Sequence, residues 1–291
     1  MCIEGGRPQR HKPHTFKTME SFFEVAKLSL EVNKPFCKKG KIFKRPGLPD
    51  LRWNPEDYDH VLYAKDFENS KNYDGKEIYG TSNDDVIFGS EKNDEIYSGE
   101  STDGFSNGNS KNLIFAGGGD DLIQGDGGAD QIYGQNGEDK VFGGEGDDLL
   151  HGGNGGDVIH GNQGDDRLYG GKGRDILDGG GGSDIINGGS DDDTITADRG
   201  SDLLIGGEGT DNFFVGFERN IQGRFMSHRI KDFSLAEEVN LLLNDELRGL
   251  RLDIKPHDRG SQLIGEDQTL LIFEGVNQAN LSFEGSTIAF V

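Results

Sequence analysis

Cysteine, long apolar runs and basic charge are all scarce in this sequence of 291 residues. Its two cysteines, Cys2 and Cys37, cannot form the disulfide framework that stabilises many small secreted domains. No apolar stretch approaches the ~20 residues of a membrane-spanning helix. The start of the chain also lacks the apolar core of a cleaved signal peptide, because Glu24 and Lys27 interrupt its apolar patch. We therefore expect no membrane span and no N-terminal signal peptide.

Basic residues are outnumbered, with 30 Lys and Arg against 53 Asp and Glu, which gives a formal charge of −23. This balance excludes a general nucleic-acid or anionic-membrane binder and favours the binding of cations. The excess lies in the middle of the chain, since residues 1–79, 80–214 and 215–291 carry +3, −22 and −4. Residues 80–214 also hold 35 of the 47 glycines and none of the seven prolines. We expect three parts with these boundaries.

The middle segment, 80–214, repeats every nine residues without a gap, which makes fifteen repeats. The eighth position of each repeat is apolar, as in Ile87, Leu150 and Phe213. The sixth position is acidic in every repeat but one, where Asn112 takes its place. The sixth-position aspartates are Asp85, Asp94, Asp103, Asp121, Asp130, Asp139, Asp148, Asp157, Asp166, Asp175, Asp184, Asp193, Asp202 and Asp211. A solvated acidic linker requires no such fixed register.

The chemistry of the repeat predicts an all-β solenoid. Repeated glycines permit positive φ, so positions one to six form a tight turn. Positions seven to nine form a three-residue strand whose middle side chain points inward. Two repeats make one coil of eighteen residues, and stacked coils give two facing parallel sheets around a thin apolar core. The absence of proline agrees, because each strand must donate to the ladder.

The turns of this solenoid bring carboxylates together. Successive turns on one side lie two repeats apart, so Asp121 stacks on Asp139 and Asp139 on Asp157. Like charges at one strand spacing repel, and a divalent cation between the turns removes the conflict. Carboxylate and carbonyl oxygens suit Ca²⁺, whereas Mg²⁺ demands a smaller octahedron. Fifteen turns paired two apart allow at most 13 calcium ions.

One complete repeat, Gly143–His151, reads GGEGDDLLH. This pattern resembles the RTX (repeats-in-toxin), or haemolysin-type, calcium-binding repeat. The resemblance implies a right-handed parallel β-roll that is disordered without calcium and folds when calcium binds. It also implies that the fourteen sixth-position aspartates are the metal ligands. Asn112, the glycine-poor start at 80–115 and Asp191, which replaces a fourth-position glycine, depart from the pattern and predict weaker sites.

The C-terminal segment, 215–291, resembles the end region of the same family in four stretches: Ile230–Phe233, Glu238–Leu241, Leu270–Val276 and Ile288–Val291. In that family this region forms a β-rich cap and contains an uncleaved signal for type I secretion. The resemblance therefore implies an extracellular protein exported without an N-terminal signal peptide. The alternative is a simple cap that covers the last strand edge.

The N-terminal segment, 1–79, predicts a small, partly helical part. Apolar residues fall on one face at helical spacing: Met19, Phe22, Phe23, Ala26 and Leu30. Four residues could be considered as zinc ligands: Cys2, His11, His14 and Cys37. Their spacing matches no standard zinc pattern, so we expect a packing face and no zinc site.

Motifs for common catalytic sites are absent from the sequence, including His-Glu-x-x-His, Gly-x-Ser-x-Gly and a phosphate loop. We therefore expect a calcium-binding roll with a structural, adhesive or interaction role and no enzymatic activity. The alternative is a repeat module that accompanies an extracellular enzyme acting on polysaccharide, lipid or protein. A pore-forming toxin would need a long apolar region that this chain lacks.

The ninth positions point outward, and every second one predicts a row of six rings on one sheet: Tyr79, Tyr97, Phe115, Tyr133, His151 and Tyr169. Such a row either stiffens its own sheet as a cross-strand ladder or forms a flat aromatic strip. An aromatic strip would dock a polysaccharide or a cell-surface partner.

Overall fold

The computed structural model describes residues 77–99, 109–234, 237–241, 252–265 and 267–276. It also describes five strands outside these ranges: β1 (Lys41–Phe43), β2 (Leu51–Trp53), β3 (His60–Tyr63), β24 (Leu281–Glu284) and β25 (Thr287–Phe290). The expected N-terminal helix, the four zinc candidates and Asp103 lie outside the described residues. Every element that the structure describes is a strand.

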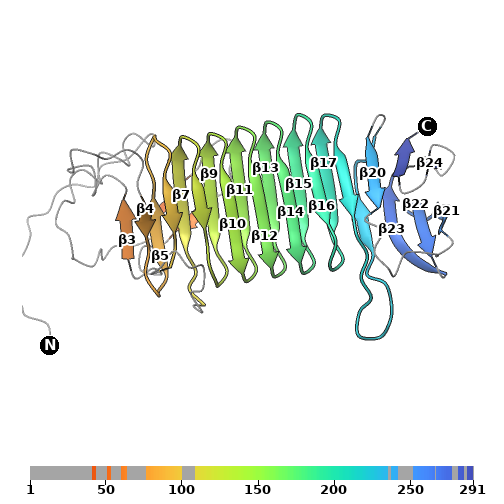
Figure 1. Cartoon of the computed structure of the whole chain (residues 1–291), viewed down its shortest axis with the longest axis horizontal. Coiled ribbons are helices and arrows are strands. Elements are labelled where there is room, and N and C mark those ends of the chain that lie inside the picture. The colour runs from red at the N-terminus through yellow and green to blue at the C-terminus, as the bar shows by residue number, and fades with distance from the viewer. Residues whose placement is uncertain are drawn as a thin grey trace, which may run out of the picture.

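The described chain is a parallel β-solenoid made of two long sheets, with strands that alternate between them (Figure 1). One sheet has 11 strands, and its repeat strands are β4 (Glu77–Tyr79), β6 (Glu95–Tyr97), β8 (Leu122–Gln124), β10 (Lys140–Glu145), β12 (Val158–Gln163), β14 (Ile176–Gly181), β16 (Thr194–Ala197) and β18 (Asn212–Val215). The other has 12 strands, and its repeat strands are β5 (Asp85–Phe88), β7 (Leu113–Gly118), β9 (Gln131–Asn136), β11 (Leu149–Asn154), β13 (Arg167–Lys172), β15 (Ile185–Ser190) and β17 (Leu203–Glu208). Strand β3 lies at one end of the 12-stranded sheet, where it pairs in parallel with β5.

The core lies between the two sheets and consists of the eighth-position side chains. Every described one from Ile87 to Phe213 is 0% exposed. Because side chains alternate across a strand, this one inward residue per repeat is flanked by two that point outward. The apolar period of the sequence therefore becomes a single column of buried side chains from each sheet.

Most repeat strands are six residues long, where the sequence predicted three. In β11, positions seven to nine are followed by the first three positions of the next repeat. The parallel register with β13 continues through Gly153↔Gly171 and Asn154↔Lys172. Gly153 has a φ of 133°, so a glycine is needed where the backbone turns while its neighbours stay paired.

The repeat register changes once, near the start of the roll. Regular neighbours such as Leu149 and Arg167 are one coil of two repeats apart, whereas Val86 pairs with Leu113 and Ile96 pairs with Ile123, three repeats apart. The prediction of unbroken stacking was therefore wrong here. Strand β5 pairs directly with β3 and β7, and β6 pairs directly with β4 and β8, so the described strands follow one another in each sheet without a gap.

This change of register divides the predicted row of rings, so that prediction was also wrong. Tyr79 and Tyr97 stack on each other in the 11-stranded sheet, with ring centroids 5.3 Å apart. The other sheet has the row Phe88, Phe115, Tyr133, His151 and Tyr169, with successive centroids 5.3, 5.1, 5.0 and 4.5 Å apart. Tyr133 is 1% exposed and Tyr97 is 8% exposed, so these two rings offer little surface to a partner, and docking of a polysaccharide or a cell-surface partner stays a prediction.

Strands beyond the repeats continue both sheets. Strand β19 (His228–Ile230) pairs in parallel with β17, and β20 (Glu238–Leu241) pairs in parallel with β18. Strand β23 (Gln268–Glu274) follows β19 and begins an antiparallel meander with β22 (Gly260–Gly265) and β21 (Leu252–His257). Strands β25 and β24 extend the other sheet in the same antiparallel way, at the right-hand end of Figure 1.

Candidate metal centre

The sixth-position residues form two ladders, one along each edge of the roll, just before the strands of each sheet. We call them ladder 1 and ladder 2. Ladder 1 contains Asp85, Asn112, Asp130, Asp148, Asp166, Asp184 and Asp202. Ladder 2 contains Asp94, Asp121, Asp139, Asp157, Asp175, Asp193 and Asp211. Each ladder therefore places seven sixth-position residues in line.

From Asp121 onward, one carboxylate oxygen of each sixth-position aspartate is fixed by the backbone of the preceding turn in its ladder. The amide of Asp121 donates to Oδ1 of Asp139 at 2.8 Å, and that of Asp139 donates to Oδ1 of Asp157 at 2.8 Å. The described sixth-position side chains are 0–2% exposed. A hydrogen bond to a charged acceptor orients the carboxylate, so its other oxygen has a defined direction.

That other oxygen is the unusual feature of the site. From Asp121 onward, ten buried Oδ2 atoms of sixth-position aspartates find no hydrogen-bond partner in the part of the chain that the structure describes. They belong to Asp121, Asp130, Asp139, Asp148, Asp157, Asp166, Asp175, Asp184, Asp193 and Asp211. A buried carboxylate oxygen without a partner is costly, and each such atom in a native structure requires an explanation. A cation bound by these oxygens would explain why they have no hydrogen-bond partner.

Backbone carbonyls face the same space. A Cβ added at Gly143 would collide with Oδ2 of Asp148 and lie 2.8 Å from the carbonyl oxygen of Gly161, in the next turn of the ladder. Gly134 stands in the same relation to Asp139 and Gly152. Glycine at the first position therefore leaves a cradle in which a carboxylate of one turn meets a carbonyl of the next.

Side chains alone do not complete this centre. In the described ranges, no group of three or more His, Cys, Asp or Glu side chains is arranged to hold a metal. A metal in the turns must therefore take several ligands from backbone carbonyls. Such an all-oxygen shell of six to eight ligands is typical of Ca²⁺.

Burial changes the acidity of the ladder carboxyls. It raises the pKa of Asp148 and of Asp175 to about 8, although the backbone hydrogen bond to each carboxylate opposes the shift. The pKa of Asp139 is raised to about 7 for the same reason. Neighbouring carboxylates, such as Asp166 beside Asp148, add to the effect. Without a cation, these side chains are therefore partly protonated near neutral pH.

The first turns differ from the regular ones. Oδ2 of Asp85 accepts the amide of Thr81 at 2.6 Å, and Oδ2 of Asp94 accepts the amide of Ser90 at 2.6 Å. Asn112 continues ladder 1 because its amide oxygen accepts the amide of Asp85 at 3.0 Å. In these turns, internal hydrogen bonds therefore satisfy oxygens that are unpartnered further along the roll.

Two residues at the far end of the ladders were not predicted from the sequence. The register Leu203↔Arg229 places His228 next to Asp202, and the register Asn212↔Glu238 places Glu237 next to Asp211. Both are buried, at 0% and 2% exposure. Neither lies at a sixth position of the nine-residue frame, so only the pairing of the strands identifies them as the last members of the ladders.

Comparison with known proteins agrees with this architecture. No helix in the described part of the chain is long and apolar enough to cross a membrane, and no curated protein matches the chain. A family model described as the RTX calcium-binding nonapeptide repeat matches seven overlapping segments: 79–114, 106–141, 115–150, 142–177, 151–186, 178–213 and 187–220. Residues 79–220 are therefore a run of RTX calcium-binding nonapeptide repeats.

Proposed function

We propose that this protein works outside the cell as a calcium-dependent structural or interaction module without catalytic activity, in which calcium drives the folding of the roll. The ten unpartnered Oδ2 atoms between Asp121 and Asp211 carry this proposal. They define cation positions that recur at every regular turn, whereas the described chain supplies no group of side chains resembling a separate catalytic metal centre.

The aspartates from Asp121 to Asp211 would hold the metal together with carbonyls of the glycine-rich turns. Among the described residues, the seven sixth-position residues in each ladder make six adjacent pairs, or twelve in the two ladders, and His228 and Glu237 each add one end position. Asp85 and Asp94 belong to the first pairs, whose oxygens already accept backbone amides. We therefore assign the stronger sites to the regular turns, while Asp103 stays a sequence-based ligand prediction.

The proposed extracellular role sets the affinity that we expect. Extracellular calcium modules bind with dissociation constants on the order of 10⁻⁴–10⁻³ M. A site that joins two turns gives steep cooperativity, because neighbouring repeats stabilise one another. At low cytosolic calcium such a chain would stay unfolded and exportable, and it would fold once calcium is abundant. The family resemblance of the C-terminal segment supports type I secretion as the route.

The test is a calcium titration of the full chain, followed by circular dichroism and calorimetry. We expect little strand signal in excess chelator, a steep rise near millimolar calcium, and several ions bound per chain. Magnesium at the same concentration is the control and should leave the chain largely unfolded, because it keeps its waters and demands a tighter shell. A strand signal that excess chelator leaves unchanged would overturn the proposal.

A further inference from the structure

The two ladders end differently at the C-terminal side of the roll. Strand pairing places His228 after Asp202 on ladder 1, whereas Glu237 follows Asp211 on ladder 2. An imidazole therefore stands where the repeat has a carboxylate. Both positions lie where the repeats meet the strands β19 and β20.

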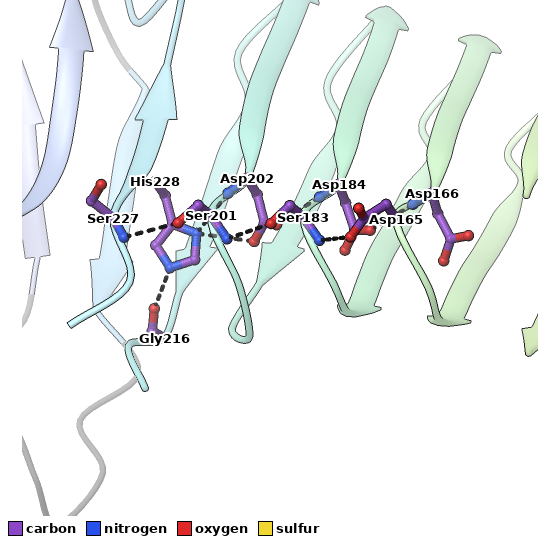
Figure 2. A network of polar contacts seen from close by, with 9 residues as sticks. All are labelled: Asp165, Asp166, Ser183, Asp184, Ser201, Asp202, Gly216, Ser227 and His228. Carbon is purple, nitrogen blue, oxygen red and sulfur yellow. Dashed lines mark hydrogen bonds and ion pairs between the residues drawn. The ribbon is translucent and has the colours of Figure 1, made fainter. Parts of the chain in front are cut away.

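His228 bridges two oxygen atoms (Figure 2). Its Nδ1 lies 2.9 Å from Oδ2 of Asp202, and its Nε2 lies 2.8 Å from the carbonyl oxygen of Gly216. The His228 and Asp202 side chains are 0% and 1% exposed. One carboxylate oxygen and one backbone carbonyl are the kinds of ligand that a calcium ion would take in a turn of the roll.

The hydrogen-bond geometry fixes where protons lie. A carbonyl oxygen only accepts, so Nε2 of His228 carries a proton and donates it to Gly216. Nδ1 accepts the backbone amide of Asp202 at 3.4 Å and lies 2.9 Å from Oδ2 of the same residue, so the ring contacts this carboxyl oxygen directly. That oxygen is thereby occupied. Among the sixth-position aspartates from Asp121 onward, Asp202 alone is missing from the set of unpartnered Oδ2 atoms in the described chain.

The fifth-position residues beside ladder 1 also lose negative charge toward its C-terminal end. The amide of Ser183 donates to Asp165 at 2.7 Å, the amide of Ser201 donates to the Ser183 hydroxyl at 3.3 Å, and the amide of Ser227 donates to the Ser201 hydroxyl at 3.4 Å (Figure 2). Hydroxyls thus replace a carboxylate as acceptors toward the end of ladder 1. The last turns of ladder 1 therefore contain less negative charge for a cation to neutralise.

Ladder 2 provides an internal comparison. Oδ2 of Asp211 has no partner among the described residues, as in the regular turns. Glu237 accepts the amide and hydroxyl of Ser234 at 2.7 and 2.6 Å, so its two carboxyl oxygens are held by Ser234 and do not close Oδ2 of Asp211. The closed oxygen is therefore specific to ladder 1 and is not a general property of the last turn.

We propose that His228 fills the last cation position of ladder 1, so that this junction closes without calcium and its last turn holds no ion. The proposal rests on the calcium-binding function proposed above. His228 acts as a built-in replacement for the metal: its two ring nitrogens join the Asp202 carboxylate to the Gly216 carbonyl across the junction. Strand β19 is thereby anchored to the repeats by protein groups alone.

The experiment counts calcium ions in the full chain by native mass spectrometry and titration calorimetry. His228→Asp restores the residue type of the repeat and should bind one more ion than the unmodified protein. His228→Asn, which matches Asp in shape but not in charge, should bind no additional ion. Circular dichroism in excess calcium checks that both variants fold. An unchanged count in a folded His228→Asp variant would overturn the proposal.

A second pair of variants tests the same idea if His228→Asp does not fold. Asp184 borders two cation positions, whereas Asp202 borders one if His228 fills the other. At a calcium concentration that just saturates the unmodified protein, Asp184→Asn should lose two ions and Asp202→Asn one. Equal losses would contradict the role of His228. Failure of the unmodified protein to bind calcium would instead refute the underlying function.

Discussion

At the scale of single residues, first-position glycines and sixth-position aspartates depend on each other. Gly143 needs no unusual backbone angle, but a methyl group there would meet Oδ2 of Asp148 and the carbonyl of Gly161. Glycine is therefore required at position 143 because the site needs the space, and not because of the backbone conformation. The same holds for Gly134 beside Asp139.

We predict that Gly143→Ala raises the calcium concentration at the folding midpoint and destabilises the calcium-loaded roll by about 1–3 kcal/mol, as overpacking does. Gly181→Ala is the matched control, because its Cβ would meet only the Gln163 side chain, at 3.5 Å or more. It should leave the roll unchanged or slightly more stable. Calcium titration and thermal unfolding measure both variants, and equal effects would contradict the assigned cradle.

The raised pKa values of the buried carboxyls predict a link between calcium and protons. The pKa values of Asp121, Asp148 and Asp175 are raised by burial to about 8, above the ~3.9 of an unfolded aspartate. The metal-free roll therefore binds more protons than the unfolded chain between these values, and it loses stability as pH rises through this window. Calcium requires the carboxylate form and must displace those protons.

We therefore predict that lowering the pH from 8 to 5 in excess chelator increases the strand signal of the metal-free chain, because protonated ladder carboxyls are neutral and no longer repel one another. Circular dichroism as a function of pH measures this gain. A strand signal that stays equally low at every pH would show that protonation does not stabilise the metal-free roll.

At the scale of elements, the register of the strands decides which repeats contribute to the roll. Asp94 hydrogen-bonds across 27 residues to Asp121, whereas Asp121 bonds across 18 residues to Asp139. The strands before residues 100–108 therefore pair with the strands after them at equivalent positions of the nine-residue repeat. Joining Gly99 to Asn109 would leave an ordinary nine-residue repeat between β6 and β7.

We predict that deleting residues 100–108 preserves the strand signal and the calcium count of the regular turns. The unfolding free energy should change by no more than about 1 kcal/mol, since loop-closure entropy depends weakly on length. Deleting residues 152–160 is the matched control and should lower the calcium count, because it removes Asp157 and the first half of β12. A similar loss of ions in both deletions would contradict the observed register.

At the scale of the whole molecule, charge opposes folding and a cation must offset it. The chain carries a net charge of −23, most of it in the repeats, and its core is one apolar side chain per repeat. Self-repulsion expands such a chain in the absence of metal. Screening by salt weakens repulsion between exposed charges, but it supplies no ligand for the buried Oδ2 atoms.

Sodium chloride and calcium should therefore act differently on the metal-free chain. We predict that ~1 M NaCl, with a Debye length of about 3 Å, reduces the radius of gyration without restoring strands. Millimolar calcium should give both compaction and strand signal. Small-angle scattering and circular dichroism on the same samples separate the two effects. Full strand recovery in salt alone would show that the turns need screening and not coordination.

The sequence by itself determined the repeat, the core and the acidic turns. Each of these depends on contacts within one repeat or between identical neighbours, so a period of nine and the alternation of a strand are sufficient. The buried positions of Ile132 and Leu150, and the alignment of Asp139 with Asp157, follow from that local periodicity.

Only the tertiary structure decided which repeats pair and how the ladders end. The Asp103 repeat fits the nine-residue frame as well as its neighbours do, and only strand pairing reveals that Val86 meets Leu113. The same holds for His228, which reaches Asp202 through the register of β17 and β19. Register is a choice among similar partners distant in the chain, so it is fixed by the packing of whole sheets and not by the residues of any one repeat.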